Sequence, residues 1–288
     1  MRKAFLILLT FMAFSFSYGQ SSLRPNIYFQ DMNYYNTAAI PLKDDQKLNF
    51  SLYTKYRFVE NEKHLWNKPP VFSLNHIGSL KNKASFYNIG ILSDQYSFYS
   101  RNTVYAGYTH KFELGKNKNH TISLGGRLAF NLDLIDWDKF QLSYSESGKS
   151  LKPNADMDLG AFYQFKNFSF GIATKNMIGT SVKLDGEKLL MNQREFYVNT
   201  SYQFHIKDKF EITPFLLYRK EIMSELDIGL HLGFFKRVHT TYQLRLIQLR
   251  HIFTLQGQIS QSLSIGLAFD YSNLLSDKNF DAVIRYTF

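Results

Sequence analysis

The chain offers few residues whose type and spacing could support catalysis or metal binding. Its carboxylate pairs are Asp44 with Asp45, Asp136 with Asp138, and Asp156 with Asp158. Asp136 and Asp138 flank Trp137 in a predicted loop and could bind a cation, but two carboxylates are too few for a calcium loop. We therefore predict no metal site.

The remaining candidate groups do not form a catalytic motif. None of the eight histidines has HExxH-type spacing. His205 and His231 fall on the polar faces of separate predicted strands and could approach each other, although polar side chains are ordinary on such faces. Gly125-Gly126 is followed neither by a P-loop pattern nor by a helix. We predict no catalytic residues, no cofactor and no enzymatic activity.

The N-terminus has the features of an export signal. Arg2 and Lys3 precede an apolar stretch from Ala4 to Phe16. The small residues Ser17 and Gly19 then suit a cleavage site after Gly19. The stretch is shorter than the roughly 20 residues that a membrane-spanning helix needs. We predict a signal peptide over residues 1–19, with an uncleaved anchor as the alternative. The absence of cysteine excludes disulfides, thiolate metal sites and a lipid-modified cysteine.

Apolar and polar residues alternate with a period of two from Gln46 to the end of the chain. In one segment, apolar residues from Leu226 to Phe234 alternate with Glu225, Asp227 and other small or polar residues. Fourteen strands are predicted: 46–58, 71–80, 85–92, 103–113, 121–133, 157–165, 167–176, 196–205, 210–219, 225–234, 238–247, 249–259, 263–271 and 281–288.

The strand faces favour a membrane barrel over a secreted β-sandwich. A Lys or Arg at the bilayer midplane of the lipid face costs about 2–4 kcal/mol. Accordingly, the apolar stripes are free of charge, and charged residues lie on the opposite faces: Lys55, Arg57, Arg127, Asp158, Asp227 and Asp270. Aromatic residues are 17% of the chain, which suits interfacial girdles. Sandwich strands average about six residues. The sequence predicts an all-β, transmembrane antiparallel β-barrel of about 14 strands over residues 46–288.

The last strand has one apolar face that includes Ile284, Tyr286 and Phe288. These residues resemble the terminal signal that the outer-membrane assembly machinery reads. We expect this strand to close the barrel by pairing with the strand that begins near Gln46.

Glycines and aromatic residues recur on the predicted inner faces. The glycines are Gly125, Gly160, Gly171, Gly229 and Gly266. Glycine allows close approach and bending in a barrel wall. Phe162, Tyr197 and Tyr53 predict a partly filled interior.

The segments between strands predict the orientation of the barrel. Short turns near 165–167 and 260–261 alternate with long loops at Lys139–Ala155 and Ile178–Arg194, and long loops usually face the outside of the cell. Residues 20–45 lack alternation and are rich in Asn, Tyr and Gln. We predict that they form an N-terminal segment that is periplasmic or lies in the lumen.

The formal charge of +10 does not indicate a nucleic-acid partner. The export signal argues against one, and the basic residues are scattered. A positive lumen, or attraction to anionic lipid headgroups in the outer membrane, fits the charge better.

Three stretches together resemble the PorP/SprF family of barrels associated with type IX secretion. They are Tyr28–Ala39, where Asn36 and Ala38 match an Asn-Pro-Ala motif with Thr37 in place of proline; Tyr105–Tyr108 followed by Ile122–Leu128; and Pro153–Asn176.

The resemblance implies an outer-membrane component or accessory of type IX secretion in a diderm bacterium. Its expected partners are other secretion components and a secreted or surface cargo such as a gliding adhesin. The long loops would contact cargo, and the N-terminal segment would meet the periplasmic machinery. The motif residues expected to contact a partner are Gln30, Asn33, Tyr35, Asn36 and Ala38.

Two other functions remain open from the sequence. The first is a passive porin or small-solute channel, provided that nothing plugs the lumen. The second is an outer-membrane lipase that uses an inward Ser or His.

Overall fold

Antiparallel strands make up most of the protein that the computed structural model describes. The described residues are 25–27, 32–40, 48–59, 71–81, 83–96, 99–115, 119–139, 148–184, 187–206, 209–221, 224–272 and 277–288. Within these ranges the helical elements are the single turn α2 (Met32–Tyr35) and the short 3-10 helix η3 (Trp137–Lys139). Neither of these described elements is long and apolar enough to cross a membrane.

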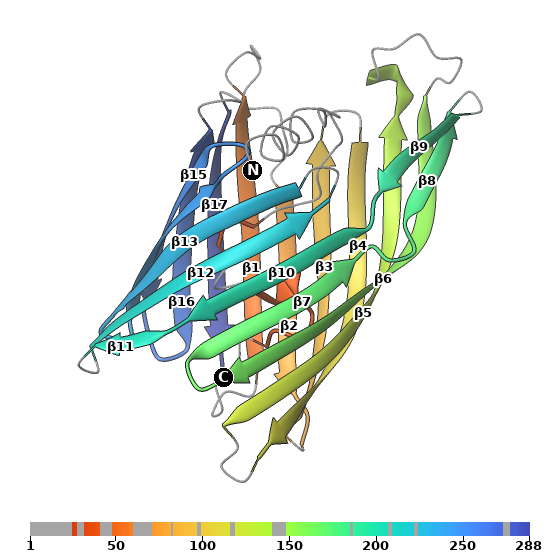
Figure 1. Cartoon of the computed structure of the whole chain (residues 1–288). Helices are drawn as coiled ribbons and strands as arrows, with labels where there is room; N and C mark the ends of the chain where they lie inside the picture. The colour runs from red at the N-terminus through yellow and green to blue at the C-terminus, as the bar shows by residue number, and fades with distance from the viewer. Residues whose placement is uncertain are drawn as a thin grey trace, which may run out of the picture.

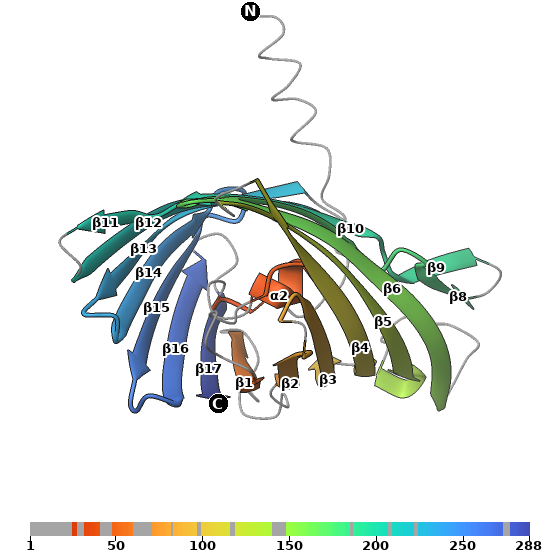
Figure 2. The same cartoon turned by 90° about the horizontal axis from the view of Figure 1, so that it is seen from below.

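The strands form one closed antiparallel barrel (Figures 1 and 2). Their bounds are β1 (Leu48–Val59), β2 (Val71–Ser79), β3 (Ser85–Tyr96), β4 (Tyr99–Leu114), β5 (His120–Asp136), β6 (Lys149–Phe165), β7 (Phe168–Lys175), β10 (Glu195–Tyr202), β11 (Phe204–Ile206), β12 (Phe210–Lys220), β13 (Ser224–Phe234), β14 (Val238–Arg245), β15 (Arg250–Gln258), β16 (Leu263–Ser272) and β17 (Asp277–Thr287). Since β10 and β11 both pair with β12 and occupy one place in the wall, the barrel has the 14 strands that the sequence predicts.

Two pairings close the wall. The last strand, β17, pairs with β1 from Asn49–Thr287 to Val59–Asp277, which confirms the pairing predicted from the sequence. On the other side of the barrel, β10 pairs with β12. Hydrocarbon offers no hydrogen-bond partner to an open strand edge, so both seams are required in a membrane.

The wall is interrupted between β10 and β11. Pairing with β12 stops at Ser201–Phe215 and resumes at Phe204–Ile212. Pro214, which has no N–H group, lies in the intervening stretch of β12. Pro214 in the sequence of β12 therefore accounts for the interruption.

The two faces of each strand are sharply different. On β5, Leu128 is 66% exposed on the outer face, whereas its neighbour Arg127 is 5% exposed on the inner face. Aromatic and histidine side chains lie on the outer face near the strand ends, as expected for interfacial girdles. At the end where the chain terminates they include His76, Tyr87, Tyr108, His110, Phe112, His120, Tyr163, Phe165, Tyr286 and Phe288.

The connections give the barrel a direction. The end of the barrel that contains Phe288 has only short connections, such as 166–167 and 235–237. The longest connections, 60–70, 137–148 and 176–194, lie at the opposite end. Because long loops face the outside in outer-membrane barrels, we assign the Phe288 end to the periplasm.

The prediction of a loop over Lys139–Ala155 is wrong for much of its length, because β6 begins at Lys149. This part of β6 lies beyond the point where pairing with β7 begins at Leu159, but it pairs with β5 throughout, and Leu151, Pro153 and Ala155 continue the apolar outer face. Pro153 lacks an N–H group, and this is tolerated because its backbone nitrogen points away from β5. Met157, four residues further along β6, has its backbone groups on the same side, and its carbonyl accepts from Met177 N at 3.0 Å and not from β5.

The predicted loop over Ile178–Arg194 contains a separate hairpin. Strands β8 (Thr180–Leu184) and β9 (Glu187–Asn192) pair only with each other and form no part of the closed sheet. Figure 1 shows this hairpin beside the barrel at the end away from the C-terminus.

Removing the closing strand is expected to abolish the barrel, whereas removing the separate hairpin is not. Deletion of residues 281–288 takes away most of the β17–β1 and β17–β16 pairs and exposes two edges to lipid. We expect no heat-modifiable band in the membrane fraction. Deletion of residues 180–192 is the control and should keep that band. A heat-modifiable barrel in the first variant would contradict the assignment.

Candidate functional site in the barrel lumen

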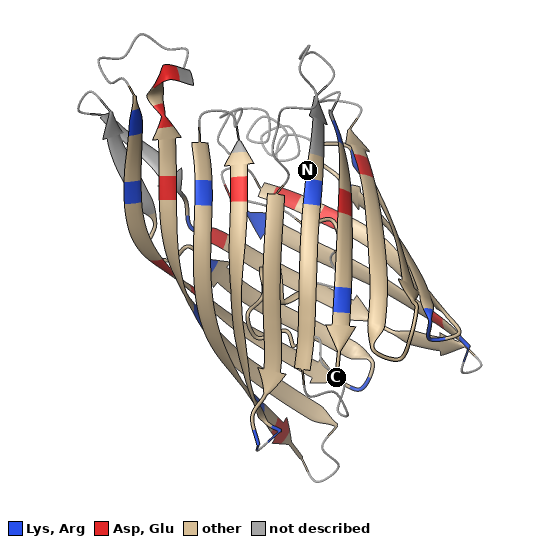
Figure 3. Cartoon of the chain, turned by 180° about the vertical axis from the view of Figure 1, so that it is seen from behind, with Lys and Arg blue, Asp and Glu red and all other residues tan. Residues whose placement is uncertain are grey.

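The lumen contains buried charges that require partners. Several inner-face residues are almost fully buried and paired: Arg219 with Glu225 and Asp227 at 2.9 Å, and Arg245 with Asp227 at 3.3 Å. Breaking such pairs leaves an uncompensated buried charge, which costs about 3–5 kcal/mol. Figure 3 shows basic and acidic positions next to one another on neighbouring strands.

Residues 25–27 and 32–40 lie inside the barrel, and Figure 2 shows α2 enclosed by the strands. We call these described residues the lumen segment. Of the two locations considered from the sequence, periplasm and lumen, these residues occupy the lumen. Their side chains complete pairings that the wall leaves open.

Asn26 is the first anchor of the lumen segment. Its backbone N–H donates to Asp281 Oδ2 at 2.8 Å, and its side-chain amide donates to Asp281 Oδ1 at 3.2 Å and also to Asp270. Lys55 Nζ lies 3.8 Å from each carboxylate, and Arg250 pairs with Asp270. Asn26 therefore supplies neutral donors to two carboxylates that also share the Lys55 ammonium group.

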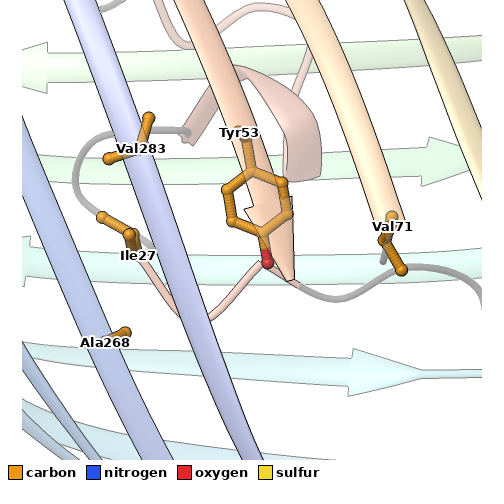
Figure 4. Packing of buried hydrophobic residues seen from close by; sticks show 5 residues of the cluster. All are labelled: Ile27, Tyr53, Val71, Ala268 and Val283. Carbon is orange, nitrogen blue, oxygen red and sulfur yellow. The ribbon is translucent and has the colours of Figure 1, made fainter. Parts of the chain in front are cut away.

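Apolar packing fixes the adjacent residue. Ile27 is buried among Tyr53, Val71, Ala268 and Val283, which come from β1, β2, β16 and β17 (Figure 4). The Tyr53 hydroxyl also donates to Asp281 at 2.6 Å. Tyr53 therefore connects the apolar cluster to the carboxylate that binds Asn26. The segment is thus held against the β1–β17 seam.

Asn33 in α2 is the second anchor. Arg127 Nη2 donates to its carbonyl at 2.6 Å and to its Oδ1 at 2.7 Å, and Asn88 Nδ2 donates to the same Oδ1 at 2.6 Å. Arg127 also lies 3.7 Å from Asp158. The Arg127 guanidinium group thereby contacts both a carboxylate of the wall and the lumen segment.

The tyrosines of α2 pack against the opposite wall. The Tyr35 ring meets Tyr197 edge to face at 5.5 Å, and its hydroxyl donates to the Pro25 carbonyl. Lys175 Nζ lies 3.6 Å from the centre of the Tyr34 ring, a cation–π geometry. The predicted inward position of Tyr197 is confirmed by this contact.

Two wall glycines make room for the chain that follows α2. Gly125 and Gly160 are paired on β5 and β6. A Cβ atom would come within 2.8 Å of Ala38 N at Gly125 and within 2.2 Å of Asn36 Oδ1 at Gly160. The close approach expected of inward glycines is therefore present here, and the Asn36 side chain and the backbone at Thr37 and Ala38 rest directly on the wall.

Asn36 organises a turn on this surface. Its side-chain amide donates to the carbonyls of Ala161 at 3.0 Å and Ile172 at 3.3 Å, while its Oδ1 accepts from Ala38 N at 3.0 Å. Ala39 N donates to Asn36 O at 2.9 Å, which closes a β-turn with Thr37 in its second position. Proline is favoured at that position, so the turn explains where the family proline fits.

The predicted partner-contact residues have contacts within the chain. Asn33, Tyr35, Asn36 and Ala38 are buried, Ala38 completely. Gln30 lies outside the described residues. Contact of any of them with a partner stays a prediction.

The predicted assembly signal lies on the outer face of β17. Ile284, Tyr286 and Phe288 are exposed, and Tyr286 meets Phe288 edge to face at 4.6 Å. Phe288 N donates to Leu48 O at 3.1 Å, which extends the closing seam to the last residue. Reading of these residues by the assembly machinery stays a prediction.

The histidines do not assemble as the sequence suggested. His231 stacks on His239 at 5.2 Å and bonds to Thr241, whereas His205 lies exposed on β11 opposite Glu211. The period of two placed His231 correctly but could not identify its neighbour, which depends on the β13–β14 register. Among the described residues, no group of three His, Cys, Asp or Glu could hold a metal ion.

A serine–histidine pair occurs on the outer face, where the sequence did not indicate one. Ser85 Oγ lies 2.9 Å from His110 Nδ1 and 2.9 Å from the Tyr108 hydroxyl. Ser85 is buried, and within the described residues the hydrogen bonds of His110 run to hydroxyl groups and to no carboxylate or amide. The pair therefore lacks the accessible nucleophile and the orienting group of a hydrolytic triad.

Sequence reasoning missed most of the wall residues that hold the lumen segment. Asn88 and Asp281 carry no motif, and strand register alone places them where they meet the lumen segment. Two signals were available: the Asn-rich composition of residues 26–36 and the inward glycines.

Comparison with known proteins supports the fold and gives a family. A sequence profile described as Type IX secretion system membrane protein PorP/SprF matches residues 17–286. No functionally curated protein matches the sequence.

Solved structures that resemble the chain are outer-membrane proteins. Omp33 of Acinetobacter baumannii is 9% identical, with a TM-score of 0.55, over 84% of this chain and 98% of the other. The toluene transporter TbuX of Ralstonia pickettii is 11% identical, with a TM-score of 0.56, over 91% and 93%. The toluene transporter TodX of Pseudomonas putida is 8% identical, with a TM-score of 0.53, over 93% and 95%. At these identities the likeness shows the barrel fold alone.

Replacing Gly125 with valine is expected to displace the lumen segment. The new side chain collides with the backbone near Ala38, and overpacking of this kind costs about 1–3 kcal/mol. We expect larger and more frequent conductance steps in a planar bilayer than the unaltered protein gives. Gly126→Val is the matched control, because that position meets only Leu159 Cδ2 at 3.4 Å and Asp158 O at 3.9 Å. Equal conductance in both variants would contradict a wall-supported plug.

Thr37→Pro is expected to stabilise the protein by about 0.4–1 kcal/mol, because proline reduces the freedom of the unfolded chain. Among the described residues, no hydrogen bond uses the Thr37 N–H, and Thr37 Oγ1 is buried without a partner. The free energy of unfolding in detergent with urea measures the effect. Thr37→Ala separates removal of the hydroxyl from restriction of the backbone. A loss of stability in Thr37→Pro alone would show that the turn is incompatible with proline.

Proposed function

Because the chain belongs to the PorP/SprF family of type IX secretion system membrane proteins, we propose that it is an accessory outer-membrane component that assists secretion or surface attachment of a cargo protein such as a gliding adhesin. The occupied lumen is the structural observation that supports this role over that of a passive porin. A barrel of this size can conduct only if its interior is left open.

The lumen segment contacts widely separated parts of the wall. Asn26 bonds to β16 and β17, Asn33 to β3 and β5, and Asn36 to β6 and β7. These contacts hold it across the interior and favour a closed resting state. In this proposal the barrel is a membrane-embedded platform, and the cargo does not pass through its lumen.

The outer end supplies rigid surfaces for cargo contact. The β5–β6 hairpin is braced by Trp137 Nε1 donating to Ser150 Oγ at 2.8 Å and by Asn154 Nδ2 donating to Asp133 at 2.7 Å. Arg101 also pairs with Asp133 at 2.7 Å. This hairpin and the β8–β9 hairpin are the surfaces that we assign to cargo.

The proposal includes no catalytic step. The buried Ser85 beside His110 supports this part of it, and assay of the purified protein for lipid hydrolysis tests it. Hydrolysis that disappears in Ser85→Ala would overturn the non-enzymatic assignment.

Deletion of the gene is expected to abolish surface display of the cargo, while the purified wild-type protein should show no steady large conductance. Surface labelling of the adhesin on intact cells measures the first effect. Complementation with the wild-type gene is the control, and complementation with the 180–192 deletion tests the hairpin as a contact. Normal display after gene deletion, with steady large openings of the purified protein, would favour the porin.

A further inference from the structure

Lys166 lies over a layered aromatic cluster on the outer face at the periplasmic end. Its Nζ is 5.4 Å from the centre of the Phe165 ring, and Phe165 stacks on His120 at 4.2 Å. His120 Nδ1 lies 2.8 Å from the Tyr163 hydroxyl. The cluster joins the β4–β5 end of the wall to the β6–β7 turn, since Lys166 N also donates to Asn119 O at 3.2 Å.

A second cluster of the same composition lies on neighbouring strands at the same end. His110 Nδ1 lies 2.9 Å from Ser85 Oγ and 3.3 Å from the Tyr108 hydroxyl, and His110 meets Phe112 at 4.5 Å. The adjoining β2–β3 turn carries the exposed Lys83. Each cluster thus combines a turn lysine, a histidine held by a hydroxyl group, and aromatic rings that face lipid.

The backbone at both lysines is one that glycine or asparagine usually adopts. Lys166 has φ of 49° and Lys83 has φ of 53°. Tight hairpin turns require a positive φ, and Lys236 in the β13–β14 turn has it too, with φ of 58°. Asparagine is therefore a compatible replacement at each of these turn positions.

The position of the clusters identifies the environment that they face. They lie at the ends of the apolar outer faces, where aromatic side chains mark the level of lipid headgroups. Lysine at this level extends its ammonium group toward the headgroups while its stem stays in apolar surroundings. With each histidine's Nδ1 at a hydroxyl group, its Nε2–H remains as a second donor beside the ammonium group.

We propose that these two clusters bind the phosphate groups of anionic phospholipids in the periplasmic leaflet. Lys166 with His120 forms one site, and Lys83 with His110 forms the other. The ammonium group and the imidazole N–H donate to the phosphate oxygens, as charge-assisted donors commonly do. Figure 3 shows further basic positions at turns of this end. His76 is another outward histidine there, with its Nε2 3.2 Å from the Tyr87 hydroxyl, on the strand that leads into the Lys83 turn.

Counting retained lipids by native mass spectrometry tests the proposal. The full-length protein is purified in detergent and mixed with equal amounts of phosphatidylglycerol and phosphatidylcholine. We expect two retained phosphatidylglycerol molecules in the wild type. Loss of one lysine near charged headgroups should weaken retention at its site about fivefold, so that Lys166→Asn and Lys83→Asn each weaken one site and the double variant weakens both. Asparagine suits the left-handed backbone, so the turns should fold, and heat modifiability checks each variant.

Lys236→Asn is the matched control. Lys236 has φ of 58° in the β13–β14 turn at the same end, and the outer faces of the adjoining strand ends carry no histidine. It should retain both lipids. His120→Phe, which keeps the stacking but removes the donor, should lose the lipid at the Lys166 site.

Several outcomes would overturn the proposal. One is equal loss of lipid in Lys236→Asn and Lys166→Asn, which would indicate attraction by diffuse charge. Another is displacement of phosphatidylglycerol by inorganic phosphate at millimolar concentration, which would indicate a site for free phosphate. A third is lysine-dependent capture of an acidic periplasmic protein without retained lipid.

Discussion

The need of every backbone polar group for a partner in hydrocarbon is the constraint from which the rest of the structure follows. It forces the strands into a closed cylinder, with β17 against β1 and β10 against β12. Closure in turn creates an interior lined by the faces that cannot meet lipid. Those faces carry Asp270, Asp281 and Arg127, which are nearly fully buried and must be paired. The lumen segment supplies part of that pairing, so wall and filling form one structural unit.

Much of the barrel could be predicted from the sequence because the two faces of a lipid-spanning strand have opposite requirements. The outer face must be apolar toward lipid, and the inner face can carry polar and charged residues. The alternation around Arg127 and Leu128 is sharp for that reason. The first residues of β6, from Lys149 to Ala155, keep the alternation, but Pro153 and the polar residues beside it are typical of a loop and hide the strand. The separate β8–β9 hairpin forms no part of the closed wall, so the requirements on the wall do not predict it.

The lumen site could be predicted only in part because its residues are brought together by register. Gly125 and Gly160 are opposite each other only when β5 and β6 are aligned, and no local pattern contains that alignment. His231 shows the same limit: its inward direction follows from the period of two, whereas its partner His239 follows from the β13–β14 register. Composition is the better indicator here, because inward glycines predict close approach to the wall without any knowledge of the register.

The Asn- and Tyr-rich composition of the lumen segment follows from where it lies. A chain inside a polar cylinder meets carboxylates, guanidinium groups and backbone carbonyls, and an amide can donate to some while accepting from others. Asn33 accepts from Arg127, whereas Asn26 donates to Asp281 and Asn36 donates to Ala161 O. Ala38 is small because it rests on the glycine of β5. The residues of the Asn36–Ala38 motif therefore make their contacts with the inner wall of the barrel.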